Sequence, residues 1–534
     1  MFLRIILSNL QSEHSTAEVC DLVVVGGGAT GLGVALQAAL EGRSVMLVEA
    51  RDFASGTSSR STKLLHGGVR YLVQGRLRLV REALRERATV LHLAPHLAQP
   101  LSFVVPVAGW LNWAFMGVGL KLYQWLAGRL SLGDTEAVSR QTLAKGMPGI
   151  AGMVGRAVAG MRYWDGQFED ARLALALAQT AQRAGARMHN HTRVTALIPV
   201  QNGWQVRLLD ARRGTLRTVQ ARCVVNAAGV WVDELRRMAL PPVAGGPPLK
   251  TLVTASQGVH LVVTRACLPL HEAVLIPRTA DGRVLFAVPW LGATLIGTTD
   301  TPRSDAPREP QPMAEELDFL FRETRNAFGL SLRPGDVRSV WVGLRPLVGA
   351  AGQGDAAQST SQMSREHLIR REAPGLVTVT GGKWTTYRSM AEEVLHTLQA
   401  HGDVPPAPNG PVDTRLHRLV GAPAQGDPAT VHPLSEAPGL HLWGSQAEQV
   451  LAMPGAEREL GMGLTEGMVR FAARHEWAWT VEDMLARRWR ALFLDARQAA
   501  TMAPAVAALL QEETGLEPRL DEFLALCQRY TLGD

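Results

Sequence analysis

Apolar and polar positions alternate along the chain in a way that predicts an α/β fold. The first apolar run, 21–25, is followed by a glycine-rich turn at 26–31, an Ala/Leu-rich segment at 32–40 and a second apolar run at 44–48. Short apolar runs of this kind are typical of buried strands, and the longer segment is typical of a helix. Strand, turn, helix and strand in this order predict one βαβ unit.

The same patterns predict further elements as far as residue 400. We expect strands at 194–198, 204–209, 223–226, 259–263, 284–288, 294–297 and 377–380, and helices at 76–93, 170–184, 313–328 and 385–399. The proline-rich segment 403–411 can be neither helix nor central strand, so it predicts a linker. Beyond it Thr480 and Asp483 fit a capping box before apolar residues at helical spacing, which predicts a mostly helical final domain.

The composition fits a globular protein of about three units, at roughly 100–200 residues per domain. Of the 534 residues, 46% are hydrophobic and 19% charged, which excludes a disordered chain. The net charge is +6, and most of the positive charge is arginine, since only five of the 55 basic residues are lysines. The basic residues are spread along the chain and form no polybasic block. This pattern argues against a nucleic-acid partner but permits an anionic substrate or an anionic membrane surface.

The four cysteines lie far apart, without a CxxC motif or a Cys/His cluster. We therefore expect no disulfide framework, no metal site and a reducing compartment. The apolar start, 1–10, is short and lacks a cleavage site of small residues, so we expect no secretory signal.

One stretch, 88–120, contains no Asp, Glu, Lys or Arg in 33 residues. Its part 101–120 reaches the ~20 residues that a membrane-spanning helix needs, but Pro106, Asn112 and three glycines interrupt it. A spanning helix, a buried core segment and a surface that touches the membrane are the three alternatives. The last is favoured, with Trp110 and Trp113 at the headgroup level.

The glycine-rich turn predicts a dinucleotide site. Gly26, Gly28 and Gly31 match GxGxxG between a strand and a helix, and Glu49 ends the next strand. The first glycine permits the tight turn, the second lets the pyrophosphate approach the backbone, and the third lets helix and strand pack closely. The helix N-terminus favours the phosphates, and the Glu49 carboxylate can accept hydrogen bonds from ribose hydroxyls.

This motif alone does not separate NAD from FAD, but its surroundings favour FAD. It lies near the N-terminus, and a strand that ends in 224–229 follows about 200 residues later, where flavoproteins return to the nucleotide. A last strand runs into the segment 381–386 and a helix, whose positive N-terminal end can face the flavin ring.

Five segments carry a resemblance to a known family: 57–72 (TSSRSTKLLHGGVRYL), 165–172 (DGQFEDAR), 296–300 (IGTTD), 343–347 (GLRPL) and 381–388 (GGKWTTYR). With the glycine turn, they resemble the FAD-dependent glycerol-3-phosphate dehydrogenases of respiratory type. The likeness covers about 20–400 and returns at about 465–500. It implies a Rossmann-like FAD-binding domain of the glutathione-reductase and amino-acid-oxidase type, interleaved with a mixed-sheet substrate domain and followed by the helical domain.

The resemblance also implies an activity and its partners. FAD would be held non-covalently, sn-glycerol 3-phosphate would be oxidised to dihydroxyacetone phosphate, and electrons would pass to a membrane quinone. The protein would then bind peripherally to the cytoplasmic face of the inner membrane, and a homodimer is left open. The implied domains are a tail at 1–19, an FAD-binding domain at 20–75, 155–245 and 350–402, a substrate and membrane-facing domain at 76–154 and 246–349, a linker at 403–415 and the helical domain at 416–534.

Carried over by motif, the resemblance gives a set of candidate site residues. Those facing the substrate would be His66, Arg70, Tyr71, Arg345 and Lys383, with His66, Arg345 and Lys383 as catalytic residues. Those touching FAD would be Gly26, Gly28, Gly31, Glu49, Thr62, Lys63, Leu64, Gly67, Gly68, Val194, Ala228, Gly229, Gly382, Lys383 and Thr385.

The chemistry of these residue types agrees with the resemblance. A buried phosphate dianion needs fixed positive charge, which Arg70, Arg345 and Lys383 can supply from three places in the chain. A neutral imidazole suits proton acceptance, so His66 is the candidate base, while Lys383 can instead stabilise the developing alkoxide. The sequence does not rank these two roles.

Several alternatives stay open at this point. The carboxylates of Asp165, Glu169 and Asp170 are interpreted as helix caps or domain-bridging groups rather than acid or base catalysts. A related flavoprotein for another hydroxy acid or an amine, an oxidase that uses oxygen, and a non-catalytic FAD or NAD sensor are the rival functions. If 88–120 were core, the membrane contact would lie elsewhere, for instance on a surface formed by Trp479 and Trp489.

Overall fold

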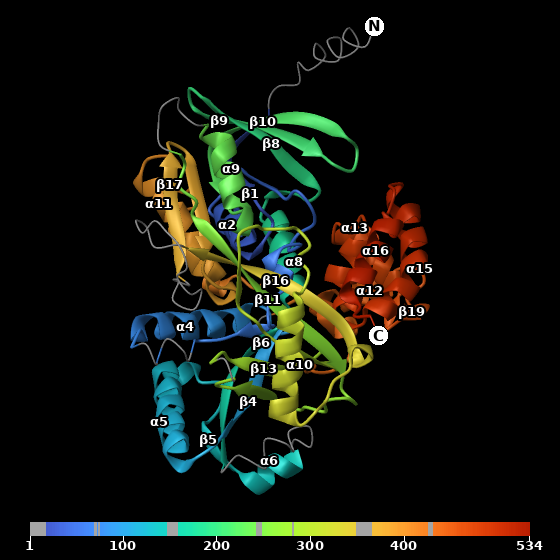
Figure 1. Cartoon of the computed structure of the whole chain (residues 1–534). Coiled ribbons are helices and arrows are strands. Elements are labelled where there is room, and N and C mark those ends of the chain that lie inside the picture. The colour runs from blue at the N-terminus through green and yellow to red at the C-terminus, as the bar shows by residue number, and fades with distance from the viewer. Residues whose placement is uncertain are drawn as a thin grey trace.

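The computed structural model describes residues 18–68, 72, 75–146, 159–241, 248–279, 282–348, 366–424 and 431–533. Two large sheets and a cluster of C-terminal helices make up the molecule (Figure 1). The predicted fold class is confirmed: α/β units and mixed sheets come first, and helices dominate the end of the chain. The predicted domain boundaries stay predictions.

The first sheet has the strand order β17-β18-β10-β1-β2-β7, with β9 paired to β10 and β8 paired to β9. Its strands are β1 (Glu18–Val25), β2 (Val45–Val48), β7 (Arg187–His189), β8 (Thr192–Val200), β9 (Gly203–Asp210), β10 (Thr215–Asn226), β17 (His367–Ala373) and β18 (Leu376–Gly381). The run from β18 to β7 is parallel, which confirms the predicted βαβ unit. Helix α2 (Ala29–Leu40) packs against both α8 (Asp170–Arg183) and α11 (Tyr387–Ala400).

The second sheet has the order β15-β11-β14-β13-β12-β4-β6-β3, with β16 paired to β11 and β5 paired to β6. Its strands are β3 (Leu64–Leu65), β4 (Ala98–Val107), β5 (Glu136–Ser139), β6 (Ala159–Phe168), β11 (Val253–Thr264), β12 (Ala273–Ile276), β13 (Leu285–Trp290), β14 (Ala293–Gly297), β15 (Thr301–Arg303) and β16 (Val337–Val348). The helices on this side are α4 (Leu77–Leu93), α5 (Trp110–Ala127), α6 (Arg140–Gly146) and α10 (Ala314–Phe328). Figure 1 shows α4 lying between the two sheets, with α5 below it.

The C-terminal domain is helical, as predicted, and stands to the right in Figure 1. It contains α12 (Ala447–Leu451), α13 (Glu466–His475), α14 (Ala491–Leu494), α15 (Ala496–Thr514) and α16 (Leu520–Tyr530). The capping box is confirmed, because the Asp483 N–H donates to Thr480 Oγ1 and the Thr480 N–H donates to Asp483 Oδ2. The segment that follows, η9 (Asp483–Arg488), is a π-helix rather than an α-helix.

The charge-free stretch 88–120 covers the end of α4, all of β4 and the first part of α5. Strand β4 is buried between β6 and β12, whereas much of the apolar surface of α5 is exposed. Within the described residues, no helix is both long and apolar enough to cross a bilayer. The part of the stretch in β4 is therefore core, and much of the part in α5 is exposed surface.

The suggested Trp479 and Trp489 surface is wrong. Trp489 is completely buried and its indole N–H donates to the Met462 carbonyl at 3.1 Å. Trp479 is half-buried and its indole N–H donates to Asn190 Oδ1 at 3.0 Å. Trp489 is therefore core, Trp479 is only partly exposed, and each indole N–H has a hydrogen-bond acceptor within the protein.

Candidate cofactor and substrate site

The glycine turn joins β1 to α2 and has the geometry that a dinucleotide requires. A Cβ on Gly31 would lie 2.0 Å from the Gly26 carbonyl oxygen, and one on Gly26 would lie 2.5 Å from the Ala227 carbonyl oxygen. These two glycines allow β1, β10 and α2 to meet closely. Gly28 caps α2, and its missing Cβ would have only Ser58 Oγ nearby, at 3.0 Å. The helix N-terminus is thus left open for a pyrophosphate.

Glu49 stands at the end of β2, where a ribose would lie. Its carboxylate accepts hydrogen bonds from the N–H groups of Gly27 at 2.7 Å and Arg51 at 2.9 Å. A carboxylate has about four acceptor positions, so two remain for hydroxyl groups. Burial raises the pKa of Glu49, while the two N–H donors oppose that shift. The residues of this edge of the sheet therefore fit the adenosine half of a dinucleotide.

The loop 57–66 connects this glycine turn to the other motifs. Ser58 Oγ accepts from the Ala29 N–H at 3.0 Å, and the Ser58 carbonyl accepts from the Trp384 indole at 2.8 Å. Thr57 Oγ1 donates to the Leu344 carbonyl at 2.6 Å. The segment before His66 is therefore bonded both to the residue that follows Lys383 and to the residue that precedes Arg345.

Arg345 lies on β16, and its guanidinium is held in a fixed direction. Nη1 donates to the Thr299 carbonyl at 3.1 Å, Nη2 donates to Thr298 Oγ1 at 3.0 Å, and Asp300 lies at 3.6 Å. The side chain keeps 28% of its surface exposed. His66 follows β3 and is half-buried, and Lys383 is half-buried at the N-cap of the turn η6 (Trp384–Thr386).

His260 on β11 belongs to this region, although the sequence analysis did not select it. Its ring is stacked on Trp341 with centroids 4.2 Å apart, and Nε2 lies 3.0 Å from Thr62 Oγ1. Burial, together with the Arg345 and Lys63 cations, holds the pKa of His260 well below its usual range, so the imidazole is neutral. The only signal in the sequence was one histidine inside the apolar run 259–263.

Comparisons with known proteins agree with this geometry. A model of the FAD-dependent oxidoreductase family matches residues 21–393, and one of the C-terminal domain of alpha-glycerophosphate oxidase matches 412–519. A mitochondrial glycerol-3-phosphate dehydrogenase from Arabidopsis thaliana is 36% identical over 93% of this chain and 84% of its own length. The human mitochondrial enzyme is 37% identical over 95% and 72%.

The chain belongs to the FAD-dependent glycerol-3-phosphate dehydrogenase family.

Solved structures support this membership of the glycerol-3-phosphate dehydrogenase family. The FAD-bound glycerol-3-phosphate dehydrogenase from Bacillus halodurans is 29% identical and superposes with a TM-score of 0.75 over 98% of this chain and 97% of that one. An L-alpha-glycerophosphate oxidase from Mycoplasma pneumoniae, at 19% identity, 72% and 95% coverage and a TM-score of 0.57, shares the fold. The cofactor of this glycerol-3-phosphate dehydrogenase family member is FAD, as predicted.

Two predicted FAD contacts have side chains that point into the core. Lys63 is completely buried, and its Nζ is paired with Asp170 at 2.7 Å and donates to the Ser59 carbonyl at 2.8 Å. Val194 packs with Val23 and Val48 beneath the first sheet. A cofactor contact at Lys63 or Val194 would therefore have to use the backbone. Arg70 and Tyr71 lie outside the described residues.

The other candidate FAD contacts come from three places: the segment after β10, the segment after β18, and β3 with the residues that follow it. Ala228 and Gly229 follow β10 and are half-buried, and Gly229 has φ +61° with open space where a Cβ would be. Gly382 has φ +72°, and Thr385 is buried in the turn after Lys383. The candidates Leu64, Gly67 and Gly68 are buried at and just after β3. Their contacts with FAD stay predictions.

The three carboxylates are structural, as interpreted. Glu169 caps α8, since its Oε2 accepts from the Arg172 N–H at 2.6 Å, and Asp170 is the partner of Lys63. Asp165 accepts from Arg87 at 3.0 Å and from the Tyr123 hydroxyl at 3.0 Å. All three are buried and bonded to neighbouring elements, so they hold segments together.

One group in the described residues has the composition of a metal site: Asp52, His191 and Asp483 lie within reach of a common point. However, both oxygens of Asp52 accept hydrogen bonds from Arg488, and Arg487 pairs with Asp52 and Asp483. These guanidinium groups already supply the positive charge that a cation would bring. The group is therefore an ion-pair network that joins the segments after β2 and β7 to the C-terminal domain.

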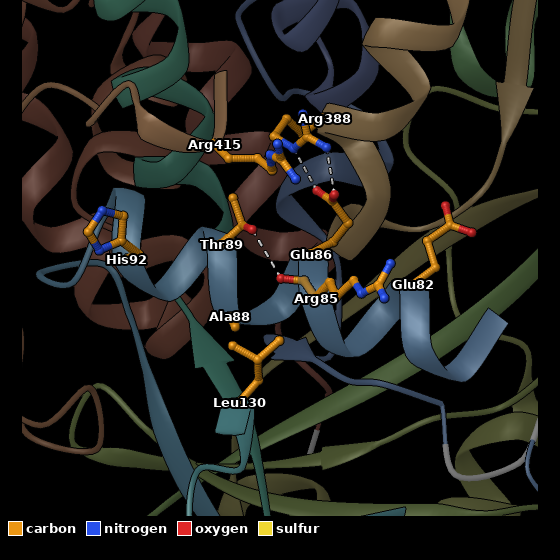
Figure 2. Close-up of a pocket in the computed structure, with 9 residues that line it drawn as sticks. All are labelled: Glu82, Arg85, Glu86, Ala88, Thr89, His92, Leu130, Arg388 and Arg415. Atoms are coloured by element: carbon orange, nitrogen blue, oxygen red, sulfur yellow. Dashed lines mark hydrogen bonds and ion pairs between the residues drawn. The ribbon is translucent and has the colours of Figure 1, made fainter. Parts of the chain in front are cut away.

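A charged cavity of about 480 Å³ opens between α4 and α11 (Figure 2). Its lining includes Glu86 and Arg388, which form a bidentate pair at 2.7 and 2.9 Å, and Arg415, which pairs with Asp413. None of the predicted site residues lines it. The Glu86–Arg388 pair joins α4 to α11, the helix that follows the Lys383 turn.

Proposed function

We propose that this protein oxidises sn-glycerol 3-phosphate to dihydroxyacetone phosphate with bound FAD, and that a membrane quinone is the final electron acceptor. The observation that carries the proposal is the bonding between the three motif segments, Thr57 to Leu344 and Trp384 to Ser58, beside the glycine turn. Those bonds bring the predicted cofactor loop together with the strand of Arg345 and the turn of Lys383. The substrate is the one named for the relatives in this family.

The proposed residues divide the work by their chemistry. Arg345 offers a planar fork whose direction is already set by Thr298 and Thr299, which suits a phosphate. Lys383 is half-buried and adds a point charge for the phosphate or the developing alkoxide. His66 accepts the hydroxyl proton of the substrate. Bound FAD would supply the acceptor for the hydride that leaves C2.

Turnover of the purified protein tests this function. We expect sn-glycerol 3-phosphate to reduce a soluble quinone analogue, while glycerol and sn-glycerol 1-phosphate support little turnover. Oxygen consumption in the same assay distinguishes a dehydrogenase from an oxidase. The match to the C-terminal domain of an oxidase makes this second measurement necessary. Turnover with another hydroxy acid or an amine but not with glycerol 3-phosphate would contradict the proposal.

We further propose that α5 lies in the headgroup layer on the cytoplasmic face of the inner membrane. Trp110, Leu111, Phe115, Val118 and Trp125 are each at least 65% exposed along this one helix. Large exposed apolar groups on one element are typical of an interaction surface, and aromatic rings favour the membrane interface. Figure 1 shows α5 at the edge of the molecule, away from the C-terminal helices.

Changing the three aromatic residues Trp110, Phe115 and Trp125 to Ser tests this surface. We leave Trp113 unchanged because it is half-buried and packs against the core. The variant should lose binding to vesicles and quinone-coupled turnover, and keep turnover with a soluble dye. Leu416→Ser, at a 75% exposed leucine outside α5, is the control. Equal loss with quinone and dye would show that α5 has a structural role instead.

A further inference from the structure

One arginine of the C-terminal domain, Arg490, contacts the loop 57–66. Arg490 is completely buried, and its Nη2 donates to the Ser59 carbonyl at 2.7 Å. Its Nε pairs with Glu169 at 2.9 Å, and Asp170 lies 3.4 Å from Nη2. The same Ser59 carbonyl accepts from Lys63 at 2.8 Å. Two cations from distant parts of the chain therefore converge on one backbone oxygen.

This cluster joins two basic side chains to two acidic ones and is closed to water. Lys63 and Arg490 are the basic members, Glu169 and Asp170 the acidic ones, and all four side chains are completely buried. Burial lowers the pKa of Lys63 to about 7, although the neighbouring Asp170 raises it. The Arg490 guanidinium also lies 4.1 Å from the Phe493 ring centroid, and Lys63 lies 4.8 Å from that of Trp341. Removing one member would leave the opposite charge buried without its partner, so each holds the others in place.

The Ser59 carbonyl is one residue away from the contacts that organise the site. Ser58 bonds to the α2 N-terminus through Ala29 and to the Lys383 turn through Trp384. Thr57, two residues away, bonds to Leu344 beside Arg345. A shift of this short turn, η1 (Thr57–Ser59), would therefore displace the glycine turn, the Lys383 turn and the Arg345 strand together.

The backbone at Arg490 indicates that this particular side chain is needed. Its φ is +68°, a left-handed conformation that non-glycine residues rarely adopt. Arg490 precedes α14, and Nη1 also donates to the Ala486 carbonyl at 2.8 Å. Glycine would suit this backbone better, but it could not reach Ser59 or Glu169.

We propose that Arg490 is a positioning residue for the cofactor and substrate site, and that the C-terminal domain acts on the reaction through it. The inference rests on the proposed function for the reaction concerned. Arg490 donates to the Ser59 carbonyl and so fixes the turn η1. In that turn Ser58 bonds to Ala29 and Trp384, and Thr57 bonds to Leu344. A misplacement of about 1 Å in such a frame can slow a reaction on the order of 100-fold.

Arg490→Met and a matched control, Arg172→Met, test the proposal. Arg172 also joins the C-terminal domain to the rest of the protein through a buried bidentate pair, with Glu476 at 2.8 and 3.0 Å, and it lies over the Trp443 ring. Both variants lose a buried interdomain ion pair, so both should lose thermal stability. We expect only Arg490→Met to slow flavin reduction by glycerol 3-phosphate, by tenfold or more, with Arg172→Met within threefold of wild type.

Three readouts that do not need turnover accompany this comparison: the FAD dissociation constant, the visible spectrum of bound flavin, and deuterium exchange in 57–66. Arg490→Met should change all three more than Arg172→Met does. If wild-type flavin were not reduced by glycerol 3-phosphate, the proposed function would fail, and these readouts would still decide the role of Arg490. Equal values in the two variants would overturn the positioning role. If Arg490→Met does not fold, Arg490→Lys and Arg172→Lys are compared in the same way. A wild-type rate of flavin reduction in Arg490→Lys would then overturn the proposal.

Discussion

Replacing Arg345 by Gln should separate substrate binding from cofactor binding. The change removes the positive charge and the fork while keeping a hydrogen-bonding amide. Loss of one partner from a hydrogen-bonded charge pair costs about 2–5 kcal/mol. Because the Arg345 side chain is 28% exposed, solvent screens part of this interaction, and we take the low end of the range, about 2–3 kcal/mol. That predicts a fall in kcat/KM for glycerol 3-phosphate of about 30- to 150-fold.

The same substitution should leave the protein folded and yellow. It removes the hydrogen bonds to Thr298 and Thr299, at about 1 kcal/mol each, which is a small part of a typical stability. The matched control is Arg303→Gln on β15, where the guanidinium is held by Asp305 and Gln257 and should not touch substrate. We expect the control to retain kcat/KM within twofold.

Steady-state kinetics with glycerol 3-phosphate and a soluble dye provide the measurement for Arg345. Bound flavin is read from the ratio of visible to protein absorbance. A value of kcat/KM within threefold of wild type in Arg345→Gln would refute the assignment of Arg345 to the phosphate. Loss of FAD from the variant would refute it too, since the residue would then support the cofactor instead.

Three other changes test separate parts of the account. Gly31→Ala should give protein without FAD, since the new Cβ would lie 2.0 Å from the Gly26 carbonyl oxygen. The control Gly119→Ala has open space around the new Cβ and should keep FAD. Equal flavin content in the two variants would contradict the assignment of the glycine turn to FAD. His66→Ala should lower kcat/KM by about 10²–10⁴-fold with FAD retained; an unchanged pH–rate profile would exclude His66 as the base. Burial and the nearby Arg487 lower the pKa of His191, but the carboxylates of Asp483 and Asp52 outweigh them, so that its pKa is raised. The folded state therefore binds the His191 proton more tightly than the unfolded state does. The contribution of His191 to the free energy of unfolding is complete below about pH 6.5 and is lost as the pH rises through the raised pKa of the folded state. Urea unfolding across this range should show that His191→Gln removes the dependence, and an equal slope in both proteins would contradict the network.

Hydrophobic periodicity predicted the elements well where one face of a segment meets the core. The helix expected at 76–93 is α4 (Leu77–Leu93), and the one expected at 313–328 is α10 (Ala314–Phe328). It did not separate β4 from α5 within 88–120, because a buried strand and an exposed apolar helix can both be rich in apolar residues. Their difference lies in what covers them: β4 pairs with β6 and β12, which lie far away in the sequence and cannot be seen in a local pattern.

The candidate site was predictable where it rests on local motifs. The glycine turn and Glu49 have the arrangement expected, because both follow from one βαβ unit. The buried pairing of Lys63 could not be read from the motif, since its partner Asp170 lies over a hundred residues away. His260 was missed for the same reason: its role depends on Thr62 and Trp341.

The central claim is tested most directly by mixing the purified protein, without oxygen or any other acceptor, with sn-glycerol 3-phosphate. We expect the flavin absorbance to bleach fully, with one dihydroxyacetone phosphate formed per flavin. Flavin that stays oxidised with this substrate, but bleaches with dithionite, would contradict the account.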